Sequence, residues 1–289
     1  MTRIEETGPV RRAFARLRRN RAAMGGAWTL VGVVLLCFGL PAALGLDAQS
    51  TDPVRHLQPP GPGAWLGRDS LGRDYLARVI VGGQTSLLIG LLATLASVTI
   101  GVFYGMVAGY YGGRVDEAMM RLVDFLYGLP YMFLVILIML LFSETARGEP
   151  LPVFLALGLI QWLTMARIVR GETRSLRERE FVLAARSIGA SDLRILVHHI
   201  LPNLLGVIIV YATLTVPAVI ILESFLSFLG LGVELSWGQL VSEGVDVLNP
   251  IHSYWWLLAA PSALLGATLF ALNFLGDGLR DAFDPRGDG

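Results

Sequence analysis

One acidic residue, Glu223, stands inside a run of apolar residues that is long enough to cross a membrane. An ionised carboxylate near the centre of a bilayer costs about 2.5–3.5 kcal/mol, so Glu223 needs a polar partner, water or a solute path beside it. A structural pair that fixes helix packing explains such a residue equally well. Gln161, in another apolar stretch, and Thr215, in the same stretch as Glu223, are cheaper polar residues, and most such residues form hydrogen bonds between helices. Glu223, Gln161 and Thr215 are the candidates for a translocation path.

Residues with the chemistry of a catalytic or metal site do not cluster in the sequence. The adjacent His198 and His199 would point about 100° apart on a helix, so they would not converge on one metal ion. Cys37 is the only cysteine, which excludes an internal disulfide and a cysteine-based metal site. The chain has no lysine, so it has no GxxxxGK(S/T) phosphate-binding loop. We expect no catalytic residue, no metal ligand and no cofactor in this chain, and a membrane enzyme is therefore disfavoured.

The apolar runs predict an all-α integral membrane protein with about six transmembrane helices. Of the 289 residues, 54% are hydrophobic and 16% are charged, whereas about 25% are charged in soluble domains. The runs show no alternation of period two, which favours helices over a barrel. The first run exceeds the apolar core of about 7–15 residues found in signal peptides, so we expect an uncleaved span. The predicted spans are Ala22–Leu46, Gln84–Ala108, Met119–Phe142, Leu151–Val169, Leu204–Leu229 and Trp256–Leu275.

The distribution of arginine predicts that both termini are cytoplasmic, because cytoplasmic loops of membrane proteins are rich in basic residues. Arginines gather in segment 1–21 and around loop 176–203, and segment 230–255 has none. The net charge is zero, which gives no sign of a nucleic-acid partner. The predicted division is a cytoplasmic segment 1–21, a first span 22–46, an extracytoplasmic loop 47–83 with a short interfacial helix at Asp74–Ile80, a membrane domain 84–275 with the cytoplasmic loop 176–203, and a cytoplasmic tail 276–289.

The cytoplasmic loop Arg177–Asn203 has the sequence REREFVLAARSIGASDLRILVHHILPN. This pattern predicts two short helices separated by a sharp turn at Gly189. Asp192 can cap the second helix, because its carboxylate can accept free backbone N–H groups. Pro202 stands at the entrance of the next span, where its missing N–H costs little. From the physical pattern alone, an amphipathic linker and a docking surface explain this loop equally well.

The order Ala184-Ala185, Gly189, Leu201-Pro202 resembles the cytoplasmic "EAA" loop of bacterial ATP-binding-cassette (ABC) importer permeases. In that family the loop forms a coupling helix that sits in a groove of the ATP-hydrolysing subunit. The chain departs from the family pattern at Leu183, where Glu is usual, and at His199, where Ile is usual. The resemblance implies a coupling surface that comprises Ala184, Ala185, Gly189, Ala190, Asp192, Arg194, Leu201 and Pro202.

Four further stretches resemble permeases of the dipeptide, oligopeptide and nickel type, and in particular the second, C-type permease of a heterodimeric pair. They are Trp65–Leu87, Gly109–Pro130, Leu226–Leu240 and Asn273–Arg286.

The resemblance implies the type I ABC importer permease fold and a place in the bacterial inner membrane. It also implies a complex with a homologous permease, two ATP-binding subunits that hold ATP and Mg, and an extracytoplasmic solute-binding protein. Peptides are the cargo most often carried by such relatives, with nickel chelates or another small solute as the alternative. A self-sufficient secondary transporter or channel is the rival class, and Glu223 alone gives it little support.

Overall fold

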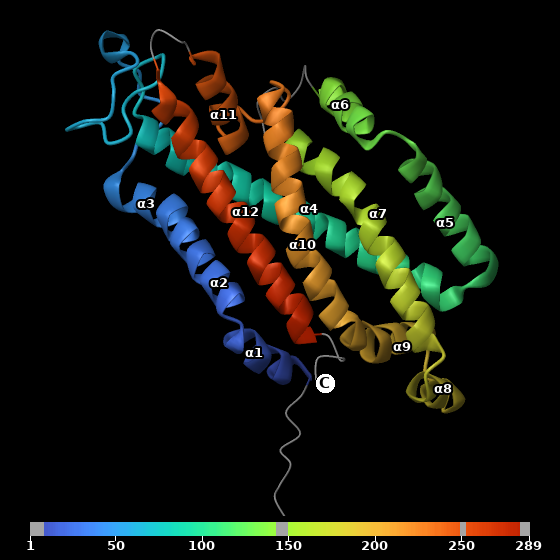
Figure 1. Cartoon of the computed structure of the whole chain (residues 1–289). Helices are drawn as coiled ribbons and strands as arrows, with labels where there is room; N and C mark the ends of the chain where they lie inside the picture. Colours follow the sequence, from blue (N-terminus) through green and yellow to red (C-terminus); the bar gives the residue numbers. More distant parts are fainter. Residues whose placement is uncertain (1–8, 143–149, 249–252, 284–289) are drawn as a thin grey trace, which may run out of the picture.

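The computed structural model describes residues 9–142, 150–248 and 253–283, and the regular elements within these residues are helices (Figure 1). Five stretches of the described chain are long and apolar enough to cross a membrane, and a bent pair of helices can supply a sixth crossing. The all-α fold with about six spans is therefore confirmed. The five stretches are Arg21–Leu44, Tyr75–Tyr111, Leu151–Arg177, Asp192–Phe228 and Trp255–Phe283.

The first span follows a short basic helix, α1 (Pro9–Arg19). Asn20 separates the two, and its side chain accepts hydrogen bonds from the first amides of α2 (Arg21–Val34). The span continues through a π-helical turn, η1 (Leu35–Gly39), into α3 (Leu40–Leu44). Most of this span lies on the outside of the bundle, where the apolar side chains are exposed. The loop after it contains one short turn of helix, η2 (Pro53–Arg55).

The prediction of a separate interfacial helix at Asp74–Ile80 is wrong. α4 (Tyr75–Tyr111) is a single helix of 37 residues, and the predicted boundary at Gln84 lies inside it. Asp74 begins this helix as its N-cap, with its carboxylate accepting the Ala77 N–H at 3.1 Å. The predicted interfacial helix and the second predicted span are therefore parts of one continuous helix, α4.

The third predicted span, Met119–Phe142, is not one straight helix. α5 (Gly113–Gly128) and α6 (Tyr131–Phe142) are bent by 85° at the break between them. Pro130 causes the break, since proline lacks an N–H and disfavours helical geometry in the residue before it. Leu129 accordingly has an extended backbone.

The centre of the bundle is the pair formed by α4 and α7 (Pro150–Arg177). Three glycines spaced by four residues bring the two backbones together, which is a common way for membrane helices to pack. A Cβ atom on Gly105 would lie 2.5 Å from the Ala166 carbonyl oxygen, and one on Gly109 would lie 2.6 Å from the Arg170 carbonyl oxygen. Gly101 is equally close to α7.

The remaining helices surround this pair (Figure 1). α10 (Leu201–Phe228) packs against α4, α7 and α12 (Trp255–Phe283), and α12 packs in turn against α2. α11 (Trp237–Asp246) covers one end of the bundle, which we call the α11 end. The opposite end carries α8 (Glu180–Ser187) and α9 (Asp192–Ile195), and we call it the α8–α9 end.

Candidate coupling site and solute path

The α8–α9 end has two short helices with a sharp turn between them, as the sequence predicts. Gly189 makes the turn with φ +83°, a left-handed conformation that glycine adopts readily. The Ala190 N–H donates to the Ala185 carbonyl at 3.0 Å and closes the end of α8. α9 then continues through a π-helical turn, η3 (Leu196–Ile200), into α10. The loop is thus joined to a membrane span without a break.

The predicted capping role of Asp192 is wrong. Ser191 occupies the N-cap position of α9, and Asp192 is the first residue of the helix. The Asp192 carboxylate instead accepts a hydrogen bond from the Tyr110 hydroxyl of α4 at 2.6 Å. The Arg186 guanidinium lies 5.4 Å from the centre of the Tyr110 ring. Its contact with the Tyr110 hydroxyl raises the pKa of Arg186, which stays charged at any physiological pH.

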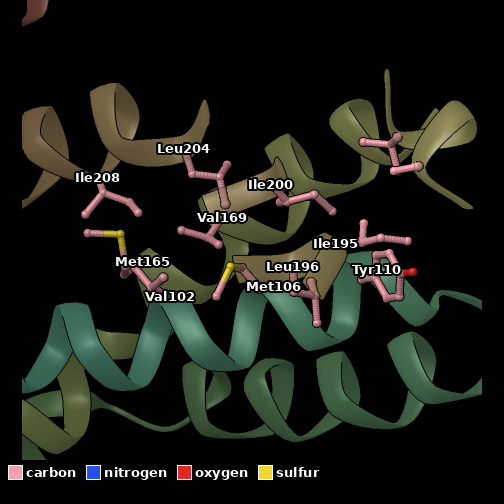
Figure 2. Close-up of a cluster of buried hydrophobic side chains, with 12 residues drawn as sticks. Val102, Met106, Tyr110, Met165, Val169, Ile195, Leu196, Ile200, Leu204 and Ile208 are labelled. Carbon is pink, nitrogen blue, oxygen red and sulfur yellow. The ribbon is translucent and has the colours of Figure 1, made fainter. Parts of the chain in front are cut away.

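An apolar cluster fixes the base of the loop to the bundle (Figure 2). Val182 and Ile195, one from each short helix, are fully buried in this cluster. Side chains of α4 and α7 face the residues of η3 and α10 across it. Movement of α8 or α9 must therefore move α4, α7 or α10 or break this contact. The buried members are Val102, Met106, Tyr110, Met165, Val169, Val182, Ala185, Ile195, Leu196, Ile200, Leu204 and Ile208.

The predicted coupling residues divide between this base and the exposed tip of the loop. Ala185 is buried in the base, and Ala190 and Leu201 pack against it. The members exposed at the tip are Ala184, Gly189, Asp192 and Arg194, and Pro202 is exposed in the first turn of α10.

Sequence reasoning missed the large apolar residues of this tip. Ile188 is 86% exposed and Leu193 is 72% exposed, with Phe181 and Leu183 exposed beside them. With 3.6 residues per helical turn, Phe181, Ala184 and Ile188 fall on one face of α8, and the buried Val182 and Ala185 fall on another. That period could have identified the exposed apolar face from the sequence.

Ion pairs tie α5 to α7 between the α8–α9 end and the middle of the bundle. Arg170 of α7 binds Asp116 of α5 with two N–H groups, one of them at 2.6 Å. Arg167 of α7 binds Asp124 at 2.7 Å and stacks over the Tyr127 ring at 4.0 Å. These ion pairs add to a buried apolar cluster in which Met120 and Val123 of α5 pack against α7.

Glu223, the predicted candidate for the solute path, is fully buried in a group of serines. Its carboxylate accepts the Ser227 hydroxyl at 2.7 Å and the Ser86 hydroxyl at 3.1 Å. The Ser86 oxygen accepts the Trp237 N–H at 3.1 Å. Glu223 thus joins α4, α10 and the start of α11, and this geometry favours the structural alternative.

The other two candidates for the path lie in different surroundings. Thr215 does not bridge two helices, because its hydroxyl donates to the Tyr211 carbonyl one turn earlier in α10 at 2.7 Å. Gln161 lines a hollow of about 430 Å³ between α5, α6, α7 and α10. The hollow is lined by Leu126, Tyr127, Leu129, Tyr131, Leu134, Ile160, Gln161, Leu163, Thr164, Ala218, Ile221 and Leu222.

A buried ionic network at the α11 end was not predicted from the sequence. Arg78 of α4 is 2% exposed, binds Asp69 at 2.7 Å and binds both oxygens of Glu243 at 2.5 and 3.0 Å. Arg73 also binds Asp69, at 2.6 Å. The network joins the loop after the first span to α4 and α11.

Within the described residues, no three His, Cys, Asp or Glu side chains gather where they could hold a metal ion.

Comparison with known proteins places this geometry in a family. Residues 101–288 match the family described as binding-protein-dependent transport system inner membrane component. Residues 8–60 match the N-terminal transmembrane domain of oligopeptide transport permease C. The solved MetNI methionine ABC transporter, in inward-facing conformations, has a chain with a TM-score of 0.58 and 16% identity, covering 71% of this chain and 96% of that chain. At this identity the match shows the fold alone.

Two curated relatives cover nearly the whole chain. The oligopeptide transport system permease protein OppC of Escherichia coli K12 is 45% identical over 279 residues, which is 95% of this chain and 90% of OppC. The dipeptide transport system permease protein DppC of Bacillus subtilis 168 is 42% identical over 277 residues, which is 95% of this chain and 85% of DppC. The chain therefore belongs to the inner membrane components of binding-protein-dependent transport systems, as a multi-pass permease subunit of an ABC importer related to the oligopeptide and dipeptide permeases.

Proposed function

We propose that this chain forms half of the translocation pore of a bacterial importer of di- or oligopeptides. The cargo is proposed from the relatives, which are named for oligopeptide and dipeptide transport. A homologous permease would form the other half of the pore, and two partner subunits would bind and hydrolyse ATP with Mg. An extracytoplasmic solute-binding protein would deliver the peptide. Both termini and the α8–α9 end would face the cytoplasm, as the arginines of segment 1–21 and loop 176–203 suggest.

The exposed apolar tip of the α8–α9 end is the observation that carries the coupling proposal. Ile188 and Leu193 project from a base whose own apolar residues are buried. Large apolar residues that gather on one exposed surface outside the lipid, as Phe181, Leu183, Ile188 and Leu193 do, mark a site for a partner protein. Exposed Arg186 and Arg194 lie beside these residues and give the surface a basic rim. We infer that this surface sits against the ATP-hydrolysing subunit.

The base of the loop gives a route for coupling. A displacement of the tip reaches α4 through the bond between Tyr110 and Asp192, and it reaches α10 through the uninterrupted η3 turn. The apolar cluster carries the same displacement to α7. ATP-driven closure of the partner subunits would thus rock three spans by contact. A self-sufficient transporter gains no support from Glu223, whose carboxylate is engaged by serines in the helix packing.

Substitutions at the tip test this proposal. Ile188→Asp and Leu193→Asp place a charge on the exposed surface and leave the buried cluster intact, so we expect normal membrane insertion. Hot-spot residues at interfaces contribute about 2 kcal/mol or more, so each variant should lose about 30-fold or more in affinity for the ATP-hydrolysing subunit. Co-purification from native membranes and ATP-driven peptide uptake by the assembled complex are the measurements.

Val54→Asp is the matched control, because Val54 is 90% exposed and lies at the α11 end. It should retain the ATP-hydrolysing subunit during purification. Unchanged co-purification and uptake in both tip variants would contradict a coupling role for this surface.

A further inference from the structure

The hollow between α5, α6, α7 and α10 lies deep within the membrane-spanning part of the chain. It touches α7 at residues 160–164, which are at least ~13 Å of helix from either end of that span. Its volume of about 430 Å³ falls within the range of about 300–1,000 Å³ that is usual for small-molecule sites.

The break in the third span opens onto this hollow. Tyr127, Leu129 and Tyr131, on both sides of the break, contribute to its lining. Backbone outside a helix is tolerated at membrane depth only where it is buried in protein or lines a water-filled cavity. The Phe133 and Leu134 amides of α6 donate to the Pro130 carbonyl, which leaves the Tyr131 and Met132 amides as those without a partner in their own helix. The break therefore places main-chain polar groups at the wall of the hollow.

The hollow is too short to hold a transmembrane helix of a partner subunit. It spans residues 160–164 of α7 and residues 218–222 of α10, which is about 6 Å of rise on each helix. A helix packed along these spans needs a groove several turns long and about 10 Å wide. A space about one turn high suits one or two amino-acid side chains of a bound molecule.

The lining defines the chemistry of that molecule. Among the described residues that line the hollow none is charged, and most are aliphatic. The Tyr127 and Thr164 hydroxyls bind each other at 2.5 Å. Gln161 is partly exposed in the hollow, where its side-chain amide can both donate and accept a hydrogen bond. A peptide offers the matching groups, which are main-chain amides and an uncharged side chain.

We propose that this hollow is a binding subsite for one uncharged, apolar residue of the transported peptide, with Gln161 holding the peptide main chain. The inference rests on the proposed peptide cargo. It adds a preference for peptides with an uncharged, apolar residue, which this chain would exert within the membrane independently of any selection by a solute-binding protein. Peptides with charged side chains would not occupy the subsite, because no charged residue lines it and the nearby Arg167, over the Tyr127 ring, is already paired with Asp124.

Protection of a cysteine in the hollow tests the subsite directly. Ala218→Cys is made in the full complex, in lipid nanodiscs without nucleotide, and its labelling by a water-soluble maleimide is timed. Cys37, the natural cysteine, is fully buried and supplies little background. Leucyl-leucine at saturating concentration should slow the labelling at least threefold, and glutamyl-glutamate should leave it unchanged.

Thr51→Cys is the control, because Thr51 is exposed in the loop after the first span and does not line the hollow. Its labelling should be the same with either peptide. Equal labelling of the A218C variant with both peptides would overturn the subsite. So would labelling that occurs in the isolated chain and is lost on assembly whatever the peptide, because a partner subunit would then fill the hollow.

Uptake in proteoliposomes separates this inference from the proposed function. Gln161→Leu should raise the KM for leucyl-leucine about tenfold and leave kcat nearly unchanged, and Gln161→Asn should recover part of the loss. If the unsubstituted complex transports no peptide, the proposed cargo is wrong. If it transports peptides while the A218C variant is unprotected and Gln161→Leu has no effect on KM, only the subsite is wrong.

Discussion

At the α11 end, the chain is held by an ionic network in which Arg78 and Asp69 are each only 2% exposed. Between the α8–α9 end and the middle of the bundle, the ion pairs of α7 with α5 are more exposed, with side-chain exposures of 33% for Arg170 and 43% for Arg167. Breaking a buried pair by removing one partner costs about 3–5 kcal/mol, whereas an exposed pair contributes about 0–1 kcal/mol. The ion pairs of the α11 end are therefore costly to break, whereas those toward the α8–α9 end contribute little.

The difference fits a molecule that keeps its shape at one end and moves at the other. Trp237 strengthens the fixed end, since it is fully buried and its indole N–H donates to the Val79 carbonyl at 2.9 Å. At the α8–α9 end, the buried cluster holds only the base of the loop, and the tip around the turn at Gly189 is exposed. Stability and coupling should therefore respond separately to substitutions at the two ends.

Arg78→Ala should have the largest effect. It leaves Asp69 and Glu243 without their shared cation, and Asp69 is buried. We expect a loss of about 3–5 kcal/mol in the free energy of unfolding, seen as a lower midpoint for denaturation of the purified chain in lipid.

Arg73→Ala is the matched control, because Arg73 binds the same Asp69 carboxylate from a more exposed position, with 21% side-chain exposure. Its cost should be about 1 kcal/mol or less. A larger loss for Arg73→Ala than for Arg78→Ala would contradict the idea that burial of the network fixes this end.

Gly105→Ala should have an intermediate effect, because it acts on the α4–α7 pair that connects the two ends. The added Cβ would lie 2.5 Å from the Ala166 carbonyl oxygen, so the backbones must move apart. Overpacking of this kind costs about 1–3 kcal/mol. Gly171→Ala is the control, since a Cβ there meets nothing within 4 Å. It should be neutral or stabilising by up to about 1 kcal/mol, because alanine is the better helix former. Equal stability of the two variants would contradict close packing at Gly105.

The sequence predicted the spans well, because the length of an apolar run follows directly from the thickness of the bilayer. The predicted helix boundaries were wrong at two places, where a single residue that ends or begins a helix was not recognised. Pro130 breaks the third span although the residues on both sides are apolar. Asp74 is the N-cap of the whole of α4, although the residues after it were predicted to form a short interfacial helix of the preceding loop. Both signals are local, so a stricter use of the rules for proline and for helix caps would have found them.

The partners of the buried charges could not be predicted in the same way. Glu223 and Ser86 are 137 residues apart in sequence, and Arg78 and Glu243 are 165 apart. Neither pair has a periodic signature, because their contact depends on how whole helices pack. The predicted coupling loop was easier to find, since its turn, its helices and its proline all lie within one short segment. The role of its exposed residues stays a prediction.

Gly189→Ala should have the smallest effect on stability and the most selective effect on coupling. Gly189 has φ +83° and Gly230, at the α11 end, has φ +78°; a Cβ at either position would meet nothing within 4 Å. The left-handed conformation costs an alanine about 1–2 kcal/mol, so Gly189→Ala and Gly230→Ala should lower stability by similar amounts.

Relief of that strain at Gly189 would rotate α9 relative to α8 and separate Leu193 from Ile188. We therefore expect fewer peptides transported per ATP hydrolysed in Gly189→Ala and an unchanged ratio in Gly230→Ala, measured in the same proteoliposomes. An equal fall in both would mean that backbone strain anywhere slows this permease, and that the α8–α9 end has no special part in coupling.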